Sequence, residues 1–120
     1  TIASEDLRSR WVAVAASDFA DGPIEDSVAK LRDAAALVDA QLADGRNWLM
    51  GDLTIADFET YGWLAGAGAL EPGLWDGKEH AAGWLARTKA HPAVQAALAR
   101  ATVADPENQW APGPEINRWG

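Results

Sequence analysis

Hydrophobic and polar residues alternate along this chain with the period of an α-helix. Between residues 24 and 43, apolar side chains recur at spacings of three and four and form one continuous stripe: Val28, Leu31, Ala35, Val38 and Leu42. The alternating β-branched or aromatic runs that are typical of strands do not occur. The pattern therefore predicts an all-α protein, a right-handed bundle of about five helices.

Breaks in this pattern predict where the helices begin and end. Ser4 suits an N-cap, and Asp21-Gly22-Pro23 is expected to end the first helix. Gly45 suits the left-handed cap that ends the second. The expected helices are about 5–20, 24–43, 54–70, 78–90 and 92–102. Residues 1–102 are thus predicted to form one helical domain and 103–120, which contain several prolines, an irregular tail.

The clearest local signal is the start of the helix at 54–70. Thr54 is the expected N-cap and Asp57 the third helical residue, so the two predict a capping box, with Leu53 and Phe58 as a hydrophobic staple. The helix that follows is apolar on nearly all sides, which predicts a buried central helix. Gly62 and Gly66 are expected to lie on one face and to let a neighbouring backbone approach closely.

Composition narrows the classes of partner. The net charge is −8 and the ten basic residues are scattered, which argues against binding to nucleic acid or to an anionic membrane surface. Cysteine is absent, the N-terminus does not resemble a signal peptide, and no apolar stretch reaches membrane-spanning length, so a cytoplasmic protein is expected. Seven tryptophans are many for this length, and four are expected to be core or domain-interface anchors: Trp11, Trp48, Trp63 and Trp84.

Candidate catalytic and metal-binding groups have simpler structural explanations. Thr54 and Asp57 could pair as a hydroxyl and a carboxylate, but the capping context makes them structural. His80 and His91 are eleven residues apart, not four, and suggest ordinary surface residues instead of a metal site. The glycines at 62–68 follow no strand and do not form a dinucleotide-binding loop. The residues by themselves therefore predict no catalytic group and no metal.

Two segments carry a resemblance to a known family. Residues 48–57, WLMGDLTIAD, resemble the aromatic-Leu-x-Gly-Asp-x-Thr-Ile-Ala-Asp segment of glutathione transferase C-terminal domains. Residues 91–98, HPAVQAAL, look like the x-Pro-x-Val-x-x-Ala-Leu helix of the same family. The order of elements is similar too, so the resemblance covers the chain from the first helix to about Ala101, and it implies the glutathione transferase C-terminal fold.

The resemblance also implies a function for which this chain is incomplete. In the family, glutathione is the co-substrate, and an N-terminal thioredoxin-like domain binds it and activates its thiol; these 120 residues contain no such unit. The helical domain supplies one wall of the pocket for the hydrophobic co-substrate, and the corresponding positions here would be Trp11, Ala15, Asp18 and Trp110. No catalytic residue and no cofactor is expected in this chain alone, and family members are usually homodimers.

A second function stays open at this point. Helical domains of this shape also occur in translation factors and aminoacyl-tRNA synthetases, where they dock partner proteins and catalyse nothing. The alternatives are therefore half of a bacterial-looking transferase that conjugates or reduces electrophiles, or a non-catalytic protein-binding module.

Overall fold

The structure, a computed structural model, describes residues 5–16, 21–102 and 104–108. Every regular element within them is helical: α1 (Glu5–Ala16), α2 (Asp21–Leu42), α3 (Ile55–Leu64), α4 (Ala67–Leu70), α5 (Glu79–Ala90), α6 (Pro92–Ala99) and the short 3-10 helix η1 (Pro106–Asn108). Two isolated bridges in the loop after α2 are the only extended pairings in this part of the chain. The predicted all-α class is confirmed.

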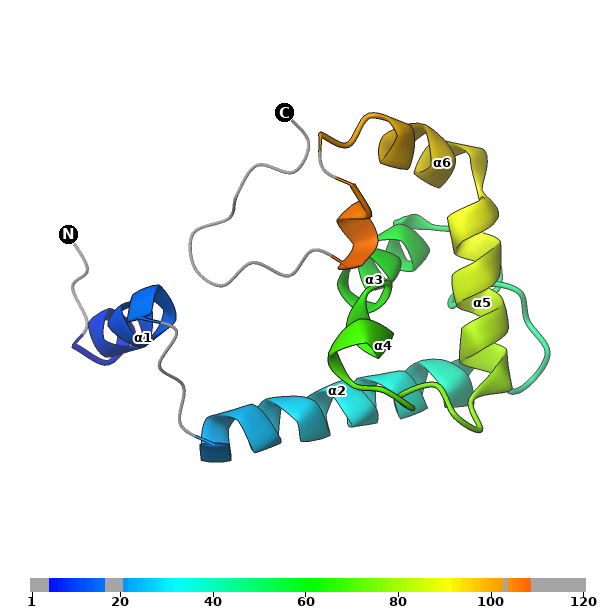
Figure 1. The fold of residues 1–120 in the computed structure, drawn as a ribbon. Coiled ribbons are helices and arrows are strands. Elements are labelled where there is room, and N and C mark those ends of the chain that lie inside the picture. Colours follow the sequence, from blue (N-terminus) through cyan, green and yellow to red (C-terminus); the bar gives the residue numbers. More distant parts are fainter. Residues whose placement is uncertain (1–4, 17–20, 103, 109–120) are drawn as a thin grey trace.

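Helix α5 is the centre of the packing. It contacts α2, α3 and α6, and α3 also contacts α4. In Figure 1, α2 runs along one side of the molecule, and the start of α5 lies beside the C-terminal end of α2. Helix α1 lies apart from the other helices. The buried face of α5 is a single stripe of Ala81, Trp84 and Thr88, three and four residues apart as the helical period requires.

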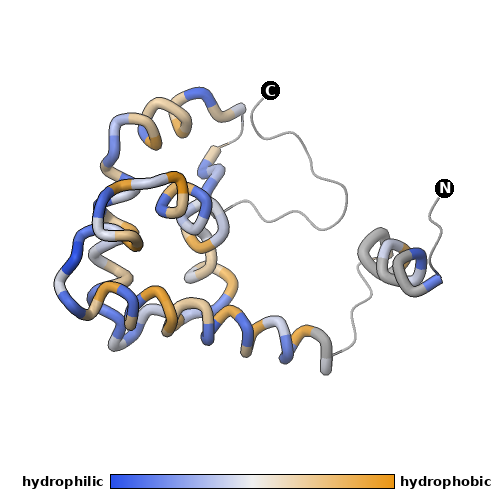
Figure 2. Tube along the Cα trace, turned by 180° about the vertical axis from the view of Figure 1, so that it is seen from behind, coloured by the Kyte–Doolittle hydropathy of each residue, from blue (hydrophilic) through white to orange (hydrophobic). Residues whose placement is uncertain are grey.

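The long helix α2 supplies the second wall of the core. Ala35, Val38 and Leu42 of the predicted stripe are buried, and the tube in Figure 2 alternates between hydrophobic and hydrophilic along this helix. Asp39 lies on the same helix and accepts a hydrogen bond from the backbone N–H of Ala81 at 2.9 Å. This bond satisfies a free donor at the start of α5, where the N-cap residue itself offers no side-chain acceptor.

The predicted helix boundaries are largely right, with two corrections. Asp21-Gly22-Pro23, expected to end the first helix, instead forms the first turn of α2, where proline needs no hydrogen-bonded N–H. The helix expected at 54–70 is broken after Leu64, and α4 starts from Gly66 at φ −89° and ψ −1°. Gly45 has the predicted left-handed conformation, at φ 89°.

The prediction of a buried central helix at 54–70 is wrong in part. Only one side of α3 is buried, through Asp57, Tyr61 and Leu64, and Trp63, expected to anchor the core or a domain interface, is 71% exposed. A helix that is apolar on all sides can be covered on all sides. Among the described elements, however, none covers the side of α3 that lies opposite these buried residues. Helix α5 has that central place, and its Trp84 is the predicted core tryptophan that is fully buried.

The close approach expected at Gly62 does not occur, whereas Gly66, the other glycine of that prediction, is buried. A Cβ atom at Gly62 would meet nothing within 4 Å, so no backbone packs against it. At Gly68, a Cβ would lie 3.2 Å from the indole nitrogen of Trp75. The requirement for a small residue at position 68 therefore comes from the ring of Trp75, in the loop after α4.

Candidate functional site

Asp57 lies fully buried where α3, α5 and the preceding loop meet. Its Oδ2 accepts a hydrogen bond from the Thr54 backbone N–H at 3.0 Å, and the Thr54 hydroxyl accepts one from the Ala56 N–H at 3.2 Å. The predicted capping box is therefore confirmed. The other carboxylate oxygen of Asp57, Oδ1, accepts hydrogen bonds from the Leu49 N–H at 3.0 Å and from the Trp84 indole N–H at 2.9 Å.

These contacts make Asp57 an organising residue. Three donors, two from the loop before α3 and one from α5, converge on one carboxylate that has no exposed surface. Because a buried carboxylate is tolerated only when its oxygens are hydrogen-bonded, this set of donors explains why an acid stands there. The Leu49 carbonyl, in turn, accepts from the Gln41 side chain at 2.8 Å, so α2 is tied to the same loop.

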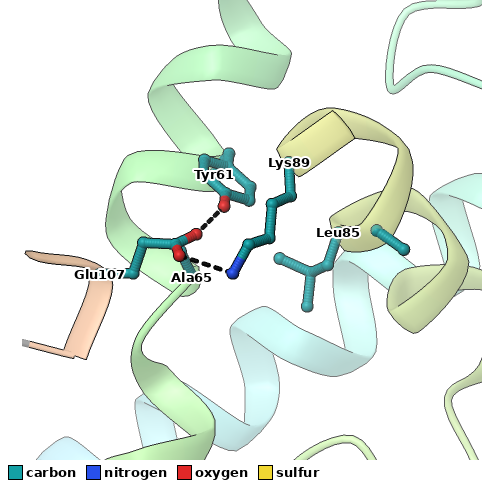
Figure 3. A pocket seen from close by; sticks show the side chains of 6 residues that line it. Tyr61, Ala65, Leu85, Lys89 and Glu107 are labelled. Carbon is teal, nitrogen blue, oxygen red and sulfur yellow. Dashed lines mark hydrogen bonds and ion pairs between the residues drawn. The ribbon is translucent and has the colours of Figure 1, made fainter. Parts of the chain in front are cut away.

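A second polar cluster lines a hollow between α3, α5 and η1 (Figure 3). The Tyr61 hydroxyl donates a hydrogen bond to Oε1 of Glu107, and the Lys89 ammonium pairs with Oε2 of the same carboxylate at 2.7 Å. The hollow has a volume of about 160 Å³, and apolar side chains complete its lining: Ala65, Leu85 and Ala86. One carboxylate thus joins a tyrosine of α3 to a lysine of α5.

The environment of Tyr61 keeps its hydroxyl protonated. Burial raises its pKa well above the ordinary value of 10, and the hydrogen bond to Glu107 and the negative charge of that residue raise it further. A phenol in this state is a hydrogen-bond donor and not a general base. Its one proton is committed to Glu107, so Tyr61 does not present a free hydroxyl to a thiol.

The two histidines differ in their roles. His80 is exposed, as predicted. His91 is half-buried and caps α6, because its Nδ1 accepts a hydrogen bond from the Ala93 N–H at 3.1 Å. Its ring also meets Phe58 edge-on, with ring centroids 5.2 Å apart. Across the described ranges, no three His, Asp or Glu residues are grouped as a metal site would need.

The residues expected to line a co-substrate pocket are only partly described. Trp11 lies on α1, 41% exposed, and does not belong to the buried core cluster. Ala15 is on the same helix. Asp18 and Trp110 lie outside the residues that the structure describes, as does most of the predicted tail at 103–120. Among the described residues of this group, Trp11 is therefore accessible on α1.

Sequence reasoning missed the cluster of Tyr61, Lys89 and Glu107. One local signal existed: Tyr61 follows Asp57 by four residues and so shares its face of α3. Glu107, however, is separated from Tyr61 by 46 residues and lies in the segment predicted to be an irregular tail. Neither periodicity nor spacing links residues that far apart.

Comparisons with known proteins found no relative of this chain. No family model, no curated protein and no solved structure matches it. Among the helices that the structure describes, none combines the length and apolar character needed to cross a membrane.

Proposed function

We propose that this chain is the C-terminal, co-substrate-binding half of a glutathione transferase-like enzyme. A thioredoxin-like domain would hold and activate glutathione, and the face of α1 that carries Trp11 and Ala15 would form one wall of the site for an electrophile. Asp18 and Trp110 complete the proposed wall. The enzyme would conjugate or reduce its substrate with the glutathione thiol.

The observation that carries the proposal is the loop-to-helix segment at 48–57. Its resemblance to the family rests on Gly51-Asp52 followed by the Thr54–Asp57 capping box, and the box has its full set of hydrogen bonds here. The fully buried carboxylate also accepts from the Leu49 N–H and the Trp84 indole. Thr54 and Asp57 of the motif therefore have a physical role in this fold, and the motif supports a relationship at the level of the fold.

The incomplete chemistry of the chain supports a half-enzyme. Activating a thiol requires a hydroxyl or thiol donor within hydrogen-bond reach of it. The sequence has no cysteine, and its single tyrosine already donates to Glu107. Neither a thiol nor an uncommitted phenol is available here, and we propose that the catalytic donor comes from the thioredoxin-like domain.

Exposed apolar side chains support a partner domain. Ile55 and Trp63 on α3 and Leu70 on α4 are all exposed, although a helix of this composition is typical of a protein interior. The thioredoxin-like domain is the partner we propose for them.

A fusion tests the proposal directly. The thioredoxin-like domain of a known glutathione transferase is joined upstream of Thr1, and conjugation of glutathione to 1-chloro-2,4-dinitrobenzene is followed by absorbance. We expect no turnover from the 120-residue chain alone and measurable turnover from the fusion. In the fusion, Trp11→Ala should raise the KM for the electrophile and leave the KM for glutathione unchanged.

The control variant is Leu37→Ala, which removes another exposed apolar side chain, on α2, and should change neither constant. Turnover by the chain alone would overturn the half-enzyme proposal. A fusion that folds and binds glutathione but shows no turnover would favour the alternative, a non-catalytic protein-binding module.

A further inference from the structure

The hollow between α3, α5 and η1 contains two hydrogen-bond donors, which lie on helices that are joined through the core. Tyr61 lies one turn after Asp57 on α3, and Lys89 lies five residues after Trp84 on α5. The buried hydrogen bond between Asp57 and Trp84, at 2.9 Å, joins these two helices directly. The backbones that carry Tyr61 and Lys89 are therefore joined to each other independently of Glu107.

The acceptor belongs to a shorter element than the donors. Glu107 belongs to η1, a helix of only three residues, and its contacts to the donor pair cross from that short element to two long helices. If the carboxylate left, a buried phenol would lose its acceptor, and an unmade hydrogen bond at a buried group costs about 1–3 kcal/mol. The donor pair therefore favours some carboxylate in that position, whether or not it belongs to Glu107.

We propose that Tyr61 and Lys89 form a binding site for a small monocarboxylate with an apolar body, and that Glu107 occupies this site as an internal ligand. The ligand carboxylate would accept a hydrogen bond from the phenol and pair with the ammonium, as Glu107 does now. Bonds of this kind between a cation and a carboxylate are among the stronger ones in proteins. The inference is independent of the transferase proposal.

The shape of the hollow limits the body of the ligand. Its volume is about 160 Å³, and Ala65, Leu85 and Ala86 form its apolar lining. An apolar cavity of about 150 Å³ in another protein is large enough for benzene. Benzoate, a carboxylate on one aromatic ring, matches both the polar end and the apolar wall. Lys89 is 55% exposed, so an anion can reach the ammonium from solvent.

Competition predicts how the site responds to mutation. A carboxylate tethered within the same chain is present at an effective concentration of about millimolar. The unmodified protein should therefore bind benzoate weakly, and Glu107→Ala, which removes the internal ligand, should bind it about tenfold more tightly or better. Adding Lys89→Met or Tyr61→Phe to Glu107→Ala should abolish that gain, because each removes one of the two donors.

Isothermal titration of the full chain with benzoate measures these affinities, with benzamide as the uncharged probe of the same shape. Circular dichroism establishes that each variant keeps its helical content. A gain for benzoate but not benzamide in Glu107→Ala, lost in both double variants, supports the proposal. Equal binding of the two probes, or a gain in benzoate affinity that survives in either double variant, overturns it.

A second measurement covers the case in which Glu107→Ala does not fold. Nuclear magnetic resonance spectra of the unmodified chain are recorded with millimolar benzoate. Displacement of the internal ligand should shift the amide resonances of Ala104, Asp105, Glu107 and Asn108 together with those around Tyr61 and Lys89. Shifts confined to other parts of the chain, or none at all, would overturn the proposal.

Discussion

Replacing Asp57 by alanine should destabilise the protein more than the loss of an ordinary helix cap. The substitution leaves three donors without their acceptor: the backbone N–H groups of Leu49 and Thr54 and the indole N–H of Trp84. Leu49 and Trp84 are buried, so water does not readily replace the carboxylate. Each buried donor left unpaired costs about 1–3 kcal/mol.

The expected magnitude follows from these contacts. Losing a cap alone costs about 0.5–2 kcal/mol, which covers the Thr54 N–H. The two buried donors add to this cost, although a water molecule in the vacated space would recover part of it. We expect Asp57→Ala to lower the free energy of unfolding by about 3–5 kcal/mol, at the upper end of what single substitutions do.

Urea unfolding followed by circular dichroism measures this difference. With a slope of about 1–3 kcal/mol/M, the midpoint should move by about 2 M while the slope stays the same. Thr54→Ala is the matched control, because it removes the other half of the capping box, a single hydrogen bond to the Ala56 N–H. It should cost only about 0.5–2 kcal/mol.

Asp57→Asn separates charge from geometry. Its carbonyl oxygen can still accept from Leu49 and Trp84, but its NH₂ group would face the Thr54 N–H, so its stability should fall between those of wild type and Asp57→Ala. If Asp57→Ala costs no more than Thr54→Ala, the bonds to Leu49 and Trp84 contribute little and the reasoning is wrong.

Three further predictions concern other parts of the molecule. Tyr61 is the only tyrosine, so its ionisation can be followed by ultraviolet absorbance: it should titrate above its ordinary pKa of 10, and Glu107→Gln should lower that pKa. Because the pKa of Tyr61 is raised in the folded state, the contribution of its protonated hydroxyl to stability is fully present below pH of about 10 and is lost as the pH rises toward the folded-state pKa. Titration of Tyr61 at pH of about 10 in the native protein would contradict this. His91→Ala should lower the free energy of unfolding by about 0.5–2 kcal/mol through loss of the α6 cap, whereas His91→Asp should retain most of it in the same urea assay. Gly62→Ala should raise the melting temperature, because alanine favours a helix by about 1 kcal/mol and the site is open, whereas Gly68→Ala should not, because its methyl group would press on an indole ring; equal effects at the two glycines would refute the packing argument.

The sequence by itself determined the local structure of this protein. The stripe of Ala35, Val38 and Leu42 predicted the buried face of α2, and the spacing of Thr54 and Asp57 predicted the capping box. These features depend on residues within one or two helical turns of each other. Their geometry is set by the 3.6-residue period and by free backbone groups at helix ends, both of which can be inferred from spacing alone.

Tertiary structure decided which helix is central and which polar groups meet. Periodicity indicated that the helix at 54–70 was apolar, but only the packing showed that α5 contacts three other helices while Trp63 is left exposed. The partners of Asp57 and Tyr61 at Trp84 and Glu107 are 27 and 46 residues away. A hydropathy pattern specifies which face of a helix prefers to be buried, whereas the group that covers that face depends on how distant segments pack together.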